Sequence, residues 1–280
     1  MLELQLWSRG DDAAAEALTQ AVEGGHVFDA LLAIEGADGE ARAAAEGALA
    51  RWADAVAQDV SGAPGCPDRA SRALRRVLVE EGELRGDAET YDAPENSLVT
   101  RVIERRRGQP ILVSSIWLEV GRRAGVAVEG VGLPGHFVAR VGGEAGRLVD
   151  PFSGGDVLSV RQCARIVHSV SGGSLPWDDA YLAPVSARQM AERVLRNLIR
   201  ARRCCRDVVP LYRAVRLYAG LRSDDAEAAL VHARTAEEIG ALRQACAIYS
   251  EIEQKFPGAS EARVAARRAE ALESAVRSMH

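Results

Sequence analysis

A histidine and an aspartate carry the clearest chemical signal in the chain. His136 lies in the glycine-framed phrase GVGLPGHFVAR (130–140), and Asp150 lies in RLVDPFSGG (147–155). A histidine held by an aspartate is two thirds of a nucleophile–His–Asp triad, in which the aspartate fixes the imidazole tautomer and the imidazole accepts the proton of the nucleophile. The chemistry of the chain therefore depends on whether a third residue, the nucleophile, accompanies this pair.

The elements that must position this pair are short strands and one apolar helix. Segments 126–131, 136–141 and 147–149 are rich in β-formers and bounded by glycine, which predicts an antiparallel meander with His136 at the start of one strand and Asp150 at the end of the next. Pro110 suits a helix's first turn, where its missing N–H has no helical partner. The free N–H groups at that helix start would stabilise the anionic form of a nucleophile placed there.

Most of the remaining sequence predicts helices. Alanine, leucine and glutamate dominate residues 11–60, which predicts helices interrupted at Gly24-Gly25 and at Gly36–Gly39, and residues 61–67 predict a break. Asp11 and Asp38 are predicted caps there. Asn96 or Ser97 is expected to cap the next helix by accepting a backbone N–H bond. Helix is also predicted over 159–170 and throughout the chain after residue 185.

The C-terminal helices contain one repeat-like pattern. Within 226–257, Ala245, Tyr249 and Pro257 have the spacing of the second-helix alanine, the aromatic residue and the closing proline of a tetratricopeptide unit. A plain helical hairpin that covers the core is the alternative interpretation. Stacked repeats need neighbours to bury their faces, so we expect this region to pack on the first domain.

The sequence from about 71 to 160 resembles the SirB-type branch of the transglutaminase-like superfamily. The matching phrases are ERRRGQPI (104–111), SIWLEVGRRAG (115–125), GVGLPGHFVAR and LVDPFSGG. The resemblance implies an α+β fold, with a transglutaminase/cysteine-protease-like core and a small antiparallel sheet, followed by an all-α tetratricopeptide-like region. We therefore predict an N-terminal helical segment at 1–67, the core at 68–184 and the repeat-like helices at 185–280.

The resemblance also assigns roles to single residues. His136 and Asp150 match the histidine and aspartate of the family, but Pro110 stands where the nucleophilic cysteine belongs. Ser114, one helical turn further on, is the candidate replacement, although its hydroxyl is expected to bond a carbonyl one turn back. Asn96 and Arg106 fall in family-typical phrases. The resemblance implies that they lie near the cleft of His136 and Asp150.

Both candidate binding residues can also be interpreted as structural residues. Asn96 suits a helix cap better than a ligand contact. Arg106 either pairs with a carboxylate of the core or binds an acidic ligand.

Three functions remain open. The leading hypothesis is a non-catalytic transglutaminase-like protein with a binding, regulatory or scaffolding role. The second is a hydrolase or acyltransferase that uses Ser114 or a displaced cysteine with His136 and Asp150. The third is an adaptor whose C-terminal helices bind a protein or peptide partner.

Composition and charge argue against several classes of protein. A net charge of −5 and a pI near 5.7 argue against a nucleic-acid surface, and no apolar run reaches membrane-spanning length. The N-terminal sequence lacks the pattern of a signal peptide. The five cysteines show no metal-ligand spacing, so we expect reduced thiols in a cytoplasmic protein with no metal and no cofactor.

Overall fold

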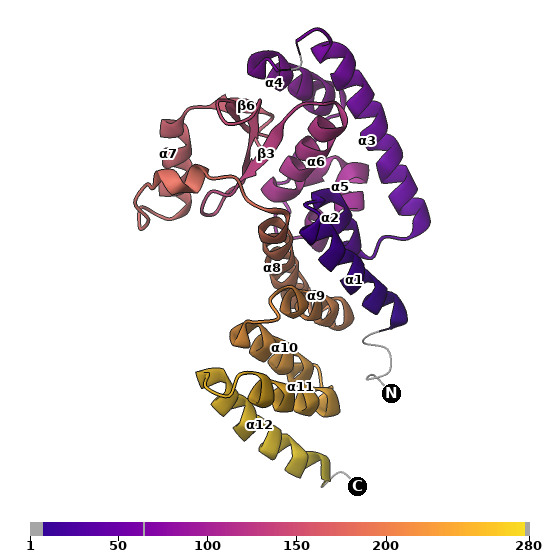
Figure 1. Ribbon diagram of the computed structural model, residues 1–280, viewed down its shortest axis with the longest axis vertical. Coiled ribbons are helices and arrows are strands. Elements are labelled where there is room, and N and C mark those ends of the chain that lie inside the picture. Colours follow the sequence, from indigo (N-terminus) through magenta and orange to yellow (C-terminus); the bar gives the residue numbers. More distant parts are fainter. Residues whose placement is uncertain (1–7, 64, 278–280) are drawn as a thin grey trace. The chain divides into compact units, whose positions relative to one another are not determined.

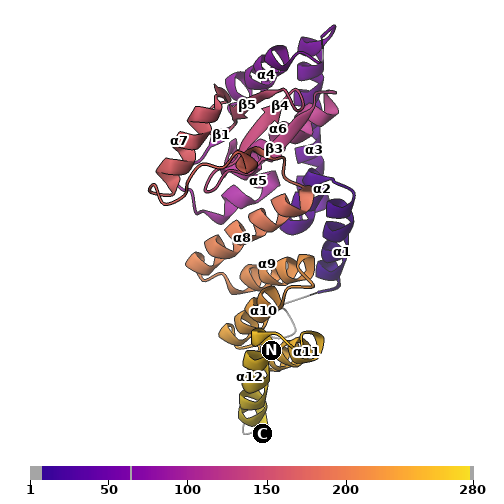
Figure 2. The ribbon, with the colours of Figure 1, turned by 60° about the vertical axis from the view of Figure 1, so that its left-hand side comes forward.

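The computed structural model describes residues 8–63 and 65–277, which form parts of two compact units (Figures 1 and 2). One unit comprises Gln20–Val194, and the other combines Leu195–His280 with Met1–Thr19. The three-part division predicted from the sequence stays a prediction; helices α2 and α3, which fall in its N-terminal segment, belong to the same unit as the core. Residues 1–7 and Pro64, within the N-terminal sequence and the predicted break, lie outside the described residues.

The N-terminal helices break where the glycine-containing stretches predict. They are α1 (Arg9–Glu23), α2 (Val27–Glu35), α3 (Gly39–Val60) and α4 (Pro67–Arg75), and α4 continues into a π-helical turn at Arg76–Glu81. Asp38 caps α3 as predicted, because its carboxylate accepts the N–H of Ala41 at 2.8 Å. Asp11 does not precede the first helix but lies inside it, and its carboxylate accepts the N–H and hydroxyl of Ser8.

The cap of α5 (Val99–Arg105) comes from a distant helix. Asn96 and Ser97, the predicted caps, lie in a short 3-10 helix at Pro94–Ser97 and make no cap. The carboxylate of Glu35, at the end of α2, accepts the N–H of Thr100 at 2.9 Å and also its hydroxyl. The tertiary packing of α2 against α5 thus supplies the acceptor that sequence reasoning sought locally.

The core sheet has the predicted antiparallel meander and one further strand. Its order is β3 (Val128–Val131), β4 (Val138–Val141), β5 (Arg147–Asp150) and β6 (Asp156–Leu158). All three pairings are antiparallel; Ala139 pairs with both Gly130 and Val149, and Asp150 pairs with Asp156. The sequence analysis missed β6, whose residues Asp156 and Val157 are exposed.

Helix α6 (Pro110–Arg123) is the buried apolar helix that the sequence predicts. It packs against α3, β3 and β4, and Leu112, Val113, Ile116 and Trp117 are completely buried. A two-residue parallel bridge, β1 (Arg85–Gly86) with β2 (Arg107–Gly108), lies just before its start. Helix α7 (Val160–Val170) follows the sheet as predicted and begins with a capping box of Ser159 and Gln162.

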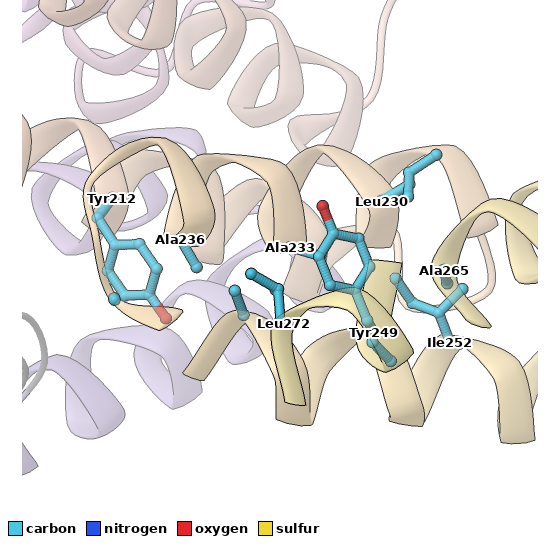
Figure 3. Close-up of a cluster of buried hydrophobic side chains, with 11 residues drawn as sticks. Tyr212, Leu230, Ala233, Ala236, Tyr249, Ile252, Ala265 and Leu272 are labelled. Carbon is cyan, nitrogen blue, oxygen red and sulfur yellow. The ribbon is translucent and has the colours of Figure 1, made fainter. Parts of the chain in front are cut away.

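Helices fill the C-terminal part of the chain. They are α8 (Ala187–Cys205), α9 (Val208–Leu221), α10 (Ala226–Glu238), α11 (Leu242–Lys255) and α12 (Ser260–Arg277), and a 3-10 turn at Asp179–Leu182 precedes them. Helices α10 and α11 form the hairpin predicted over 226–257. Ala245 and Tyr249 are fully buried in its apolar cluster. Figure 3 shows Tyr249 in this cluster with Tyr212 and Ala233.

These observations confirm the predicted α+β class with a small antiparallel sheet and a helical C-terminal region. The tetratricopeptide assignment of α10 and α11 stays a prediction. Across residues 8–63 and 65–277, no helix combines the length and apolar character that crossing a membrane requires.

Candidate functional site

The predicted histidine–aspartate pair forms. Nε2 of His136 lies 2.9 Å from Oδ2 of Asp150, and the two side chains are 12% and 5% exposed. Asp150 ends β5 as predicted, whereas His136 lies in the turn just before β4 rather than within the strand. That turn contains Gly135 at a φ of 72°, a left-handed conformation that glycine adopts without steric cost.

The carboxylate of Asp150 is held from several sides. The backbone N–H groups of Phe152 and Ser153 donate to Oδ1 at 3.1 and 3.3 Å, and the hydroxyl of Ser153 donates to Oδ2 at 2.9 Å. These three donors fix the position of the carboxylate. Asp150 can therefore act as the fixed acceptor that orients the imidazole of His136.

The imidazole is also held on its flanks. The ring of Phe152 meets that of His136 edge-on, with 5.9 Å between centroids. Gly86 makes room for this ring, since a Cβ there would lie only 2.2 Å from Phe152. Arg193 donates to the backbone carbonyls of Leu133 and His136 at 3.2 and 2.8 Å, which fixes the turn from the side of α8.

The pair faces an open groove of about 540 Å³. Its walls come from the turn after β5, from β6 and from α7, and include Ser153, Leu158, Gln162 and Arg165. Because Nε2 of His136 is bonded to Asp150, Nδ1 is the nitrogen left for another partner. Among the described residues, no group forms a hydrogen bond with it.

The position matched to the nucleophile holds no reactive atom. Pro110 is buried and occupies the first turn of α6, as its sequence predicts. Ser114 is completely buried, does not line the groove of His136, and its hydroxyl has no hydrogen-bond partner. The expected bond to a carbonyl one turn back is made instead by its neighbour Ser115, to Ile111 at 2.7 Å.

The cysteines offer no exposed replacement at the groove. Cys163 on α7 is fully buried among apolar residues such as Leu133 and Val138. Burial, helped by the charge of Asp150, raises the pKa of its thiol, which disfavours the reactive thiolate. The remaining cysteines are free thiols and do not line the groove: Cys66, Cys204, Cys205 and Cys246.

Asn96 is buried and fully engaged inside the protein. Its amide Nδ2 donates to the carbonyl of Thr90 at 2.7 Å and to Asp87 at 3.2 Å, and its Oδ1 accepts from Arg105 at 3.0 Å. The side chain thereby ties the loop before α5 to the end of that helix. It does not line the groove of His136.

Arg106 also lies away from that groove. It follows the last residue of α5 in a left-handed conformation with φ of 59°, and its guanidinium stacks on Trp52 at 4.4 Å from the ring centroid. It pairs with no carboxylate among the described residues. The first of its two predicted roles, pairing with a core carboxylate, is therefore wrong.

Two polar residues escaped the sequence analysis: Gln109, before α6, and Ser153, in the turn after β5. Gln109, the residue before the helix, is fully buried; its Nε2 donates to the carbonyl of Tyr91 at 3.1 Å and its Oε1 accepts the Ser97 hydroxyl at 3.0 Å. Ser153 completes the shell of Asp150. Both lie directly beside residues that the motif analysis quoted, in GQP and DPFS, which was the available signal.

No cluster of three or more histidine, cysteine, aspartate or glutamate side chains suited to a metal exists within the described residues. The one buried acid on α6, Glu119, is instead paired with Arg122 and Arg123 at 2.7 and 2.6 Å.

An apolar helix packed on an antiparallel sheet, with a histidine before one strand and an aspartate ending the next, defines a transglutaminase-like core. A family model for the transglutaminase-like superfamily matches residues 43–196, more than half of the chain. The chain belongs to this superfamily.

Similar proteins occur in bacteria and in mammals. A UPF0162 protein of Xylella fastidiosa is 39% identical over 130 residues, which are 45% of this chain and 46% of that protein. A UPF0162 protein of Pseudomonas aeruginosa is 32% identical over 131 residues, 47% of each chain. Mouse F-box only protein 21 is 28% identical over 136 residues, 45% of this chain and 21% of that protein.

The match spans less than half the length of each of these relatives. No solved structure matches the chain.

Proposed function

We propose that this chain is a non-catalytic member of the transglutaminase-like superfamily that binds a ligand at the groove of His136 and serves a regulatory or scaffolding role. The observation that carries the proposal is Pro110 at the first turn of α6. A proline offers no thiol or hydroxyl for nucleophilic attack. His136 retains its aspartate, but Nδ1 has no hydroxyl or thiol to deprotonate among the described residues.

The groove keeps features that suit binding. Nδ1 of His136 and the exposed guanidinium of Arg165 both belong to groove-lining residues, and the Phe152 ring and Leu158 add apolar surface. A pocket that combines apolar walls with a few polar groups is the usual form of a small-ligand or peptide site. Loss of the nucleophile leaves these binding groups intact.

The test combines chemical probes with direct activity measurements. The purified chain is incubated with an electrophilic thiol probe and a serine-directed fluorophosphonate, and with peptide amide and ester substrates. We expect no labelling or turnover that depends on His136. A covalent adduct on any residue that disappears in His136→Ala, with the fold of the variant verified by circular dichroism, would overturn the proposal.

The second candidate is a hydrolase or acyltransferase with a serine or displaced-cysteine nucleophile. The 2.9 Å bond between His136 and Asp150 favours it, because this is the orientation a general base needs. Activity lost in both His136→Ala and Ser114→Ala would support Ser114 as the nucleophile. Activity lost in His136→Ala and Cys163→Ala would assign the role to the cysteine, and activity that survives His136→Ala would exclude both mechanisms.

The third candidate is a peptide-binding adaptor built on tetratricopeptide-like helices. The C-terminal unit contains a cavity of about 330 Å³ whose lining includes Ala229, His232, Ile248 and Phe256. Peptides selected from a random library on the intact chain should lose affinity when Ala229→Trp fills the cavity. Ala271→Trp, an exposed position on α12 outside the cavity, is the matched control. Equal affinity for both variants would exclude this groove.

We also propose a branch of the family and a cellular location for this chain. Membership of the SirB-type branch is supported by the phrases around residues 104–155. A cytoplasmic location is supported by free cysteines at all five positions.

A further inference from the structure

The guanidinium of Arg106 has an unusual environment. Its Nη1 is enclosed by protein and has no hydrogen-bond partner, and its Nε and Nη2 have none among the described residues. Stacking on Trp52 at 4.4 Å covers one face of the group. A charged group that has lost part of its hydration without gaining an acceptor is costly, so it calls for a complementary anion.

A second arginine without a partner lies within electrostatic range. Arg51 on α3 is exposed, and no carboxylate pairs with it among the described residues. Burial lowers the pKa of Arg106 from its usual value, and the like charge of Arg51 adds to that effect. Two adjacent cations that repel each other favour the binding of an anion between them.

Both arginines line a groove of about 670 Å³ that does not share residues with the groove of His136. Helices α3 and α5, which pack on each other, form its walls, and alanines of α3 contribute much of its lining. Asp38 precedes α3 and Arg51 lies 13 residues further along, which corresponds to about 20 Å at the rise of an α-helix. The groove therefore has an acidic and a basic end.

Most acidic groups of the groove already have a hydrogen-bond or ion-pair partner other than Arg51 and Arg106. Glu35 accepts from Thr100, Asp38 accepts from the N–H of Ala41, and Glu104 pairs with Arg101 at 2.7 Å. Glu40, which has no such bond, lies at the start of α3, far along the helix from Arg51. The protein thus leaves the positive charge at the basic end unneutralised.

We propose that Arg51 and Arg106 form a binding site for an oxyanion, a carboxylate or phosphate group, at the basic end of the groove between α3 and α5. Nε and Nη2 of Arg106 form one edge of the guanidinium fork and match two oxygens of such a group. Trp52 fixes the plane of that fork. Arg51 supplies the second charge, and the alanine-lined remainder of the groove accommodates the rest of the ligand.

The test measures binding of inorganic phosphate and of glutarate to the intact chain by calorimetry at constant ionic strength. At least one of the two anions should bind, and the one that binds more tightly identifies the oxyanion class. Arg51→Gln and Arg106→Gln should each weaken binding by about tenfold or more, the usual effect of losing a charge-assisted hydrogen bond. Trp52→Phe should retain binding but lose the tryptophan fluorescence change that the stacked Arg106 predicts.

One control separates this site from general charge effects. Arg72→Gln removes an exposed arginine of α4 outside the groove and should leave affinity unchanged. If Arg106→Gln fails to fold, the exposed Arg51 still supplies a variant. The proposal is overturned if neither anion binds at millimolar concentration, or if Arg72→Gln weakens binding as much as Arg51→Gln.

Discussion

At the scale of single residues, the site combines the ordered pair of His136 and Asp150 with a proline at the position that the family resemblance assigns to the nucleophile. His136 and Asp150 keep the geometry of a catalytic pair, and Ser153 and the backbone of Phe152 hold the carboxylate. Ser114 has the right chemistry but is completely buried, without a hydrogen bond. A serine that serves as nucleophile needs contact with its base, and this one makes none.

The buried hydroxyl of Ser114 predicts a stability effect. Ser114→Ala should raise the free energy of unfolding by about 1 kcal/mol, because it removes a desolvated polar group that has no partner. Urea unfolding measures the change. The matched control is Ser115→Ala, which deletes the bond to Ile111 and should lower the free energy by up to about 1 kcal/mol. Clear destabilisation by Ser114→Ala would show that its hydroxyl has a partner.

A cysteine introduced at the start of α6 tests whether position 110 faces His136. Pro110→Cys should give a cysteine whose alkylation by iodoacetamide at neutral pH is about tenfold faster than in the double variant with His136→Ala, because an imidazole that faces position 110, as the family resemblance implies, would favour the thiolate. Peptide mass spectrometry separates this thiol from the five natural cysteines. Equal alkylation rates in both backgrounds would mean that Pro110 does not face His136.

At the scale of elements, the start of α5 is completed by a partner from distant sequence. Helix α5 has no local cap; Glu35 at the end of α2 accepts the N–H and hydroxyl of Thr100. Burial raises the pKa of Glu35, and the bonds from Thr100 oppose this effect. The position of α5, and of Arg106 immediately after it, therefore depends on one carboxylate in another helix.

This cap is open to a direct test. Glu35→Ala should lower the free energy of unfolding by about 1–2 kcal/mol, the cost of losing a helix N-cap. The control Glu104→Ala removes an exposed carboxylate on α5 that pairs with Arg101 and should change stability by less than about 0.5 kcal/mol. Thermal or urea unfolding of the two variants gives the comparison, and equal effects would contradict a capping role for Glu35.

At the scale of the whole molecule, the chain separates a transglutaminase-like core from a unit of helices that has its own apolar core. In that second unit, burial, with the charge of Arg216, lowers the pKa of His232 to about 4 from its ordinary 6.5. Its Nε2 lies 3.1 Å from the hydroxyl of Tyr212. The folded unit therefore prefers the neutral imidazole.

This preference predicts acid lability of the helical unit. Between pH 6.5 and 4 the unfolded chain binds more protons at His232 than the folded chain, so stability is complete above pH 6.5 and decreases as the pH falls toward 4. The loss at pH 5 should be about 2 kcal/mol. Hydrogen exchange in α9–α11, corrected for intrinsic rates, measures it. His232→Gln should remove this pH dependence, and an unchanged dependence would mean that another group titrates.

The sequence alone predicted much of the architecture and part of the site. Periodicity and glycine-containing breaks predicted α2, α3, α6 and α7, because these signals are local. The phrases around His136 and Asp150 predicted their pairing, since the meander of β4 and β5 brings the two residues together. The short strand β6 was missed because its exposed residues carry no apolar alternation.

Local sequence thus determined most of the helices and three strands of the meander. It also determined that His136 would meet Asp150, because hydrogen-bonded strands that adjoin in the chain leave little choice of partner. Only the tertiary structure decided the rest: that Glu35 rather than Asn96 caps α5, that Ser114 is enclosed beside a back-bonded Ser115, and that Arg106 meets Trp52 instead of a carboxylate. Those outcomes depend on which helix faces pack together, and packing joins residues whose separation in the chain gives no signal.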